Sequence, residues 1–182
     1  MLMTVTELRQ YVSTDETDQV LEAMLQALEL SIRAYTNNNF QVRPFRAVAV
    51  AMGNTLMVNT AIPFKVGDTL QITDSDLQDN ALVTVEAVDG DIITVKEDLY
   101  DESAVVITKV AYPADVKMGV VNMVKWELAN RDKVGVASET ISRHSVTYVD
   151  QTKENMVMGY PVALMGFLKR YQKARFGQGL RV

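Results

Sequence analysis

The hydrophobic pattern near the start of the chain has the period of an α-helix. From residue 15 to about residue 37, apolar side chains recur every three or four positions, which places them on one face of a helix. The members of this stripe are Leu21, Met24, Leu25, Leu28, Ile32 and Tyr35. Asn37-Asn38-Asn39 is expected to end the helix, because asparagine favours turns over helix interiors. A shorter helix is expected from Thr4 to about Val12, because Thr4-Val5-Thr6-Glu7 has the spacing of a capping box.

From residue 45 to residue 110 the hydrophobic period changes to two, which is the period of β-strands. Gly53-Asn54 separates two runs of strand-like residues, and Asp89-Gly90-Asp91 separates two more, so both are predicted hairpin turns. Several short strands with turn residues between them predict a small antiparallel β-barrel or sandwich.

The helical period returns after residue 110. Pro113 suits the first turn of a helix, where its missing N–H needs no partner, and this helix is expected to run to about Arg131. Trp126 lies off the apolar stripe of this helix, so Trp126 and Arg131 are candidates for contacts between subunits. Gly159-Tyr160-Pro161 opens a last helix, in which Gly166 is expected to permit close packing.

These patterns predict an α+β fold with a discontinuous helical domain. Residues 1–44 and 111–176 form the helical domain, and residues 45–110 form an inserted β module. Residues 177–182 are expected to be a flexible C-terminal tail.

The amino-acid composition limits the chemistry of the chain. Hydrophobic residues make up 48% and charged residues 23%, which is enough apolar material for a core. The absence of cysteine excludes disulfides, thiolate nucleophiles and cysteine-based zinc sites, and the single histidine, His144, cannot form a histidine cluster. Asp74, Asp76 and Asp79 have only part of the calcium-loop spacing and are better explained as turn residues. We therefore expect no enzymatic activity, no cofactor and no metal.

Neither a membrane span nor a signal peptide is expected. No apolar stretch approaches the roughly 18 residues of a membrane-spanning helix. The first residues, Met1-Leu2-Met3-Thr4, have neither the basic region nor the apolar core of a signal peptide. A cytosolic product that binds no membrane is expected.

The net charge of −5 hides a strong asymmetry along the chain. Residues 45–110 hold four basic and eleven acidic side chains, whereas residues 111–182 hold eleven basic and six acidic ones. No acidic residue follows Glu154. An acidic middle part and a basic last part of the chain favour head-to-tail contacts between subunits, or a contact of the basic part with an acidic partner. The alternative is a solvated basic helix face, since cations also complement the dipole at a helix C-terminus.

Short motifs follow one another in a fixed order through the predicted helical parts. They are Leu8-Arg9-Gln10-Tyr11-Val12, Asp15-Glu16-Thr17-Asp18, Tyr112-Pro113-Ala114-Asp115-Val116-Lys117, Arg131-Asp132-Lys133-Val134-Gly135-Val136, Ser138-Glu139-Thr140-Ile141-Ser142, Ser145-Val146-Thr147-Tyr148, Gly159-Tyr160-Pro161, Arg170-Tyr171 and Arg175-Phe176. In this order, residues 1–44 and about 111–176 resemble the head–tail connector (adaptor) proteins of long-tailed bacteriophages. The resemblance implies a four-helix connector-type helical domain. Many members of this family lack an insertion like the β module, so residues 45–110 depart from the family pattern.

Members of that family form a dodecameric ring beneath the portal, extend its DNA channel and present a platform for the stopper and tail. The resemblance therefore implies a structural virion protein of the phage neck, located at the head–tail junction and assembled in the host cytoplasm. Its implied partners are the portal protein, head-completion (stopper) or tail proteins, and other copies of itself. Double-stranded DNA is expected to pass through the channel without sequence-specific binding, because a weakly repulsive wall lets a polyanion slide.

The C-terminal segment is the expected portal-binding part. Its candidate residues are Lys169, Arg170, Lys173, Arg175, Phe176, Leu180, Arg181 and Val182. Two other functions stay open. Tyr171 and Phe176 stand between basic residues, an arrangement that also suits stacking on nucleic acid in a regulatory protein. The chain could also be an accessory subunit of an enzyme, which would need a second chain with an active site.

Overall fold

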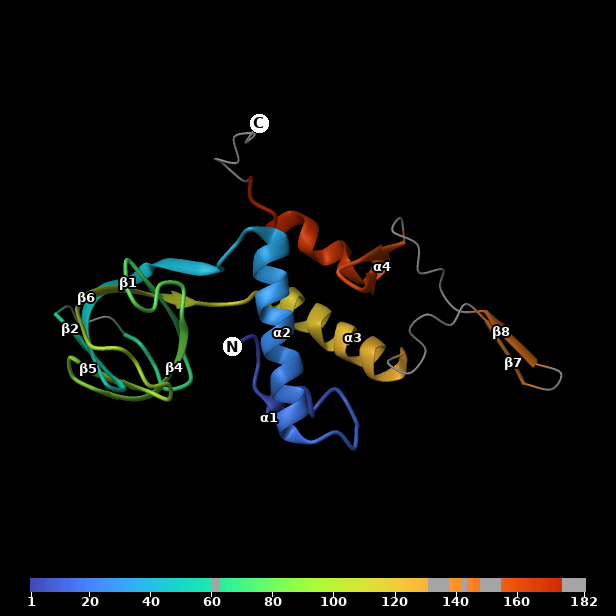
Figure 1. The fold of residues 1–182 in the computed structure, drawn as a ribbon, viewed down its shortest axis with the longest axis horizontal. Helices are drawn as coiled ribbons and strands as arrows, with labels where there is room; N and C mark the ends of the chain where they lie inside the picture. Colours follow the sequence, from blue (N-terminus) through green and yellow to red (C-terminus); the bar gives the residue numbers. More distant parts are fainter. Residues whose placement is uncertain (60–62, 131–137, 142–143, 148–154, 175–182) are drawn as a thin grey trace. The chain divides into compact units, whose positions relative to one another are not determined.

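The structure, a computed structural model, describes residues 1–59, 63–130, 138–141, 144–147 and 155–174 (Figure 1). The chain divides into two units. The barrel unit consists of residues 39–112 together with Met1, and the helical unit consists of residues 2–38 and 113–182. The boundaries between the units therefore lie a few residues outside the ends of the β module expected from the sequence.

The barrel unit is a closed β-barrel of antiparallel strands (Figure 1). Its strands are β1 (Gln41–Met52), β2 (Thr55–Val58), β3 (Thr69–Thr73), β4 (Leu82–Asp89), β5 (Ile92–Val95) and β6 (Glu102–Val110). Around the barrel they follow the order β1-β2-β5-β4-β3-β6, and β6 pairs with β1 to close the sheet. Closure leaves these strands without a free sheet edge, the usual starting point of strand-mediated aggregation.

The core of the barrel is built from the alternate side chains that point inward. Its small members on β1 are Ala47, Ala49 and Ala51. Its larger members, each at most 1% exposed, are Leu56, Leu70, Ile72, Ile93 and Ile107. Small side chains on one strand make room for the large ones of the other strands, so the interior is filled.

Within its described residues, the helical unit contains two long helices and several short elements (Figure 1). The helices are α1 (Val5–Leu8), α2 (Asp18–Thr36), α3 (Ala114–Asn130), α4 (Val162–Met165) and the 3-10 helix η2 (Gly166–Tyr171). The strands are β7 (Ser138–Ile141) and β8 (His144–Thr147), which pair with each other, and β9 (Met156–Val157) and β10 (Tyr160–Pro161), which form a second pair.

The predicted four-helix connector-type helical domain is wrong. Among the described residues, only α2 and α3 are long helices, with 19 and 17 residues, whereas α1 and α4 have four residues each. The expected last helix is one α-helical turn followed by η2. Met165 at the end of α4 and Leu168 on η2 are both buried, and their spacing of three positions fits the three residues per turn of a 3-10 helix.

A glycine of α3 lets η2 pack closely against that helix. A Cβ atom on Gly119 would lie 2.2 Å from Cζ of Phe167, so the Phe167 ring rests on the backbone of α3. By contrast, a Cβ on Gly166 would meet nothing within 4 Å. The expectation that Gly166 permits close packing is therefore wrong, and Gly119 has that role.

Candidate assembly surface of the helical unit

The structure describes three of the eight predicted portal-binding residues. Lys169 and Arg170 lie on η2, Lys173 follows it, and all three are exposed. The other predicted contact residues that lie outside the described residues are Arg131, Arg175, Phe176, Leu180, Arg181 and Val182. We call residues 169–174 the basic segment.

Two asparagines at the end of α2 hold the basic segment in place. Asn37 Nδ2 donates to the carbonyl of Ala174 at 3.0 Å, and Asn38 Nδ2 donates to the carbonyl of Tyr171 at 3.1 Å. In addition, the backbone N–H of Lys173 donates to the Thr36 carbonyl at 2.8 Å, which satisfies one of the carbonyls left open at a helix end. These bonds join parts of the chain more than 130 residues apart, so the basic segment is a fixed part of the helical unit.

Arg170 and Tyr171 bind the first turn of α3. Arg170 Nη2 forms an ion pair with Asp115, and the Tyr171 hydroxyl donates to Asp115 Oδ1 at 2.7 Å. Arg170 Nη2 also donates to the Tyr171 hydroxyl oxygen at 2.8 Å. Burial alone raises the pKa of Asp115, but the Tyr171 hydrogen bond and the Arg170 charge outweigh it, so this pKa lies below its ordinary value of 3.8. Arg170 therefore stabilises the helical unit internally, whereas Lys169 and Lys173 are exposed cations.

Trp126 is half-buried and packs within the helical unit. Its ring lies 5.5 Å from the ring of Tyr160, centroid to centroid, with the planes tilted by 58°. The Tyr160 hydroxyl donates to the Glu127 carboxylate, also on α3. Burial, the hydrogen bond to Glu127 and the Glu127 charge together raise the pKa of Tyr160, so the hydroxyl keeps its proton. The predicted contact between subunits can therefore use only the solvent-accessible part of the Trp126 side chain.

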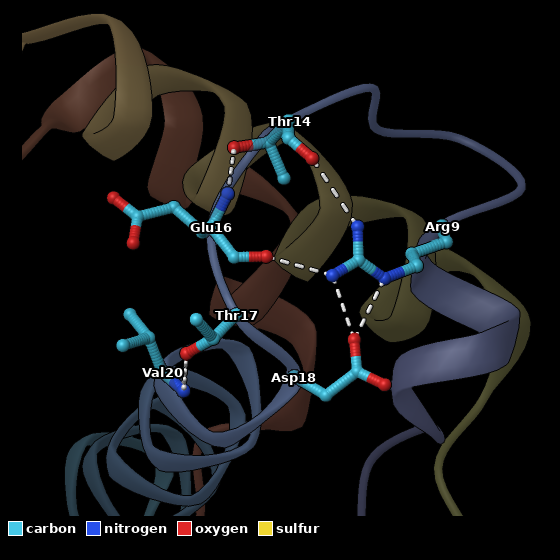
Figure 2. A network of polar contacts seen from close by, with 6 residues as sticks. All are labelled: Arg9, Thr14, Glu16, Thr17, Asp18 and Val20. Atoms are coloured by element: carbon cyan, nitrogen blue, oxygen red, sulfur yellow. Dashed lines mark hydrogen bonds and ion pairs between the residues drawn. The ribbon is translucent and has the colours of Figure 1, made fainter.

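A network around Arg9 ties α1 to the start of α2 (Figure 2). The Arg9 guanidinium donates to the carbonyls of Thr14 at 3.2 Å and Glu16 at 2.7 Å, and it pairs with Asp18 Oδ1. Thr17 caps α2 by accepting a hydrogen bond from the N–H of Val20 at 3.4 Å. The guanidinium fork can bind several carbonyls at once, which explains how a one-turn α1 is joined firmly to α2.

Sequence reasoning found the cations of this surface but missed their anchors. The sequence pattern indicates a helix end at Asn37 and Asn38 and a helix start near Asp115, but no contact of these residues with the basic segment. The spacing of residues along the chain carries no signal for contacts between such distant positions.

The described part of the chain offers no metal site of the usual kind. Within the described ranges, no three His, Cys, Asp or Glu side chains gather closely enough to hold an ion. None of the helices in these ranges is both long enough and apolar enough to cross a membrane.

The chain matches no protein-family model, and no curated protein matches its sequence. The resemblance to phage connectors therefore rests on the motifs alone.

Proposed function

We propose that this chain is a structural subunit of the neck of a long-tailed bacteriophage and not an enzyme. It forms a ring under the portal, extends the DNA channel, and joins the head to the stopper and tail. The basic segment carries the proposal: Asn37 and Asn38 fix it to α2, and Lys169 and Lys173 stay exposed on it. The order of the motifs along the sequence supplies the phage context.

The charges of the basic segment favour an acidic protein partner. Asp115 neutralises Arg170, but no acidic residue follows Glu154 in the sequence, and Arg175 and Arg181 continue the basic run. A charged hydrogen bond shielded at an interface contributes about 1.5–3 kcal/mol. Repetition around a ring turns such single contacts into firm attachment to the portal.

The geometry of Tyr171 favours protein assembly over nucleic-acid binding. The Arg170 guanidinium carbon lies 4.9 Å from the centre of the Tyr171 ring, and the Tyr171 hydroxyl is bonded to Asp115. One face of this ring is thus covered by the chain itself, which leaves less of it for stacking on a base.

The test is a double charge reversal, Lys169→Glu with Lys173→Glu. We expect binding to the cognate portal to weaken by about tenfold for each lost ion pair, because a charged contact contributes about 1.5 kcal/mol or more. Co-sedimentation with portal measures the binding, and complementation of a phage lacking this gene measures assembly. Electron microscopy of the unmodified chain mixed with portal shows whether a ring forms.

The matched control is Lys125→Glu, which reverses an exposed cation on α3 outside the basic segment. It should bind portal as the unmodified chain does. Portal binding by the double variant at full strength would contradict the proposal. Salt-dependent binding of the unmodified chain to free DNA, without binding to portal, would favour the regulatory alternative.

A further inference from the structure

The outer side of strands β6, β1, β2 and β5 carries an apolar surface. Its members, together called the barrel face, are Val48, Val50, Met52, Met57, Ile92 and Val106. Val50 pairs with Met57, and Met57 pairs in turn with Ile92 on β5. Val48 pairs with Val106 on β6. Paired residues of neighbouring antiparallel strands project from the same side of the sheet, so these side chains form continuous rows.

The strands of the barrel face carry few acidic residues. None lies on β1, β2 or β5, whereas β6 begins at Glu102 and Asp89 of β4 pairs with Ile92. Arg46 on β1 and Lys96 after β5 are exposed cations beside the face. Val48 and Met52 are each 52% exposed, and Ile92 is 44% exposed. Contiguous exposed apolar patches with a polar rim mark binding surfaces.

The helical unit has an apolar surface of its own on the outer side of α2. Four exposed residues, together called the α2 stripe, are Ala23, Ala27, Leu30 and Ala34. Their spacing of three or four residues places them on one face of the helix. Leu30 is 64% exposed, although it lies in the middle of a long helix. Glu22, also exposed, adjoins the N-terminal end of the stripe.

We propose that the barrel face of one subunit binds the α2 stripe of a second copy of this chain. This contact, repeated from subunit to subunit, closes the ring, so the inference rests on the proposed function. A ring requires two different patches on every subunit, one for each neighbour, and the chain carries two. Their sizes agree, since the stripe is about 16 Å long and four strands are about 14 Å across. Arg46, an exposed cation beside Val48 on the barrel face, gives Glu22 at the end of the stripe a partner of opposite charge.

Cross-linking tests the contact directly, because the chain has no cysteine of its own. Ile92→Cys and Leu30→Cys are made in separate chains, mixed with and without portal, and treated with a short bis-maleimide. We expect cross-links between the two variants and none within either variant alone. One chain carrying both substitutions should give a ladder of linked subunits. Leu77→Cys is the matched control, since Leu77 is 61% exposed but lies in the β3–β4 loop, outside the strands of the barrel face, and it should not link to Leu30→Cys.

Substitution by a charge gives a second measurement. Ile92→Asp and Leu30→Asp should each weaken self-association at least tenfold in analytical ultracentrifugation, whereas Leu77→Asp should leave it unchanged. The proposed contact is overturned if the Ile92 and Leu30 variants do not cross-link, or if the only link forms inside single chains that carry both cysteines.

Portal binding by the unmodified chain, measured in parallel, separates the two proposals. Portal binding without the Ile92–Leu30 cross-link overturns the contact and leaves the neck function standing. Cross-linked subunits that never bind portal overturn the neck function and leave the contact standing.

Discussion

At the scale of single residues, the helical unit depends on the close approach of the Phe167 ring to Gly119. A methyl group added at Gly119 would overlap this ring, with 2.2 Å to its Cζ atom. The ring must then move or the two elements must separate, and overpacking of this kind costs about 1–3 kcal/mol. Alanine also favours a helix over glycine by about 1 kcal/mol, which offsets part of that cost.

Gly119→Ala should therefore destabilise the helical unit by about 1 kcal/mol. The midpoint of urea unfolding, followed by circular dichroism, measures the change. Gly166→Ala is the matched control, because its methyl group meets nothing within 4 Å. That variant should be as stable as the unmodified chain, or more stable by up to about 1 kcal/mol. Equal midpoints for the two variants would contradict the packing of Phe167 on α3.

The ion pair at the start of α3 predicts a dependence on pH. The pKa of Asp115 in the folded chain lies below its ordinary value of 3.8, so folding favours the ionised carboxylate. The ionised Asp115 carboxylate therefore stabilises the folded chain fully at pH values above 3.8, and this stabilisation is lost as the pH falls through the lowered pKa. Asp115→Asn should lower the unfolding midpoint at pH 7, and the difference from the unmodified chain should shrink as the pH falls below 3.8. A difference that stays constant over this range would mean that the carboxylate charge has no part in it.

At the scale of elements, the turn signals within the barrel were reliable. Both predicted hairpins are confirmed: Met52 pairs with Thr55 across the first turn, and Asp89 pairs with Ile92 across the second. In each case a glycine with positive φ, Gly53 or Gly90, forms the turn. Such turns are encoded by adjacent residues and are therefore visible in a sequence.

The pairing of strands that are distant in sequence could not be predicted from local residues in this way. The barrel closes because β1 pairs with β6, which joins residues as far apart in sequence as Gln41 and Val110. Each strand alone is equally compatible with a barrel or a sandwich, so the sequence left both open. The last helix was overestimated because its apolar pattern does not distinguish a continuous α-helix from one α-helical turn followed by a 3-10 helix.

The attachment of the basic segment gives a prediction about one element. Asn38→Ala removes the donor to the Tyr171 carbonyl and should destabilise residues 171–174 by about 1 kcal/mol. The amide of Lys173, which donates to the Thr36 carbonyl, should then exchange with solvent hydrogen several-fold faster. Asn39→Ala, a change at an exposed neighbouring position, should leave this exchange rate unchanged. Unchanged exchange in both variants would mean that other contacts suffice to hold the segment.

At the scale of the whole molecule, the barrel unit has its own core and a closed set of strand pairings. Residues 39–112 expressed alone should therefore fold, with dispersed amide resonances and one cooperative urea transition. Leu56→Asp in the same fragment places a charge at a fully buried position and should abolish that transition. An unfolded fragment without the substitution would show that the barrel needs the remainder of the chain.

The pairing of the first and last strands of the barrel also affects the order of folding. Gln41 pairs with Val110, and the N–H of Ala111 donates to the Phe40 carbonyl at 3.0 Å, so the chain enters and leaves the barrel at neighbouring points. Synthesis delivers residues 39–112 before α3, which gives the barrel time to form first. Once the barrel has folded, the flexible chain between α2 and α3 is only a few residues long. The entropic cost of bringing α3 to α2 is therefore lower by about 2–3 kcal/mol than for an unfolded connection of the same length. The insertion thus becomes a connection that helps the two helices to meet during translation.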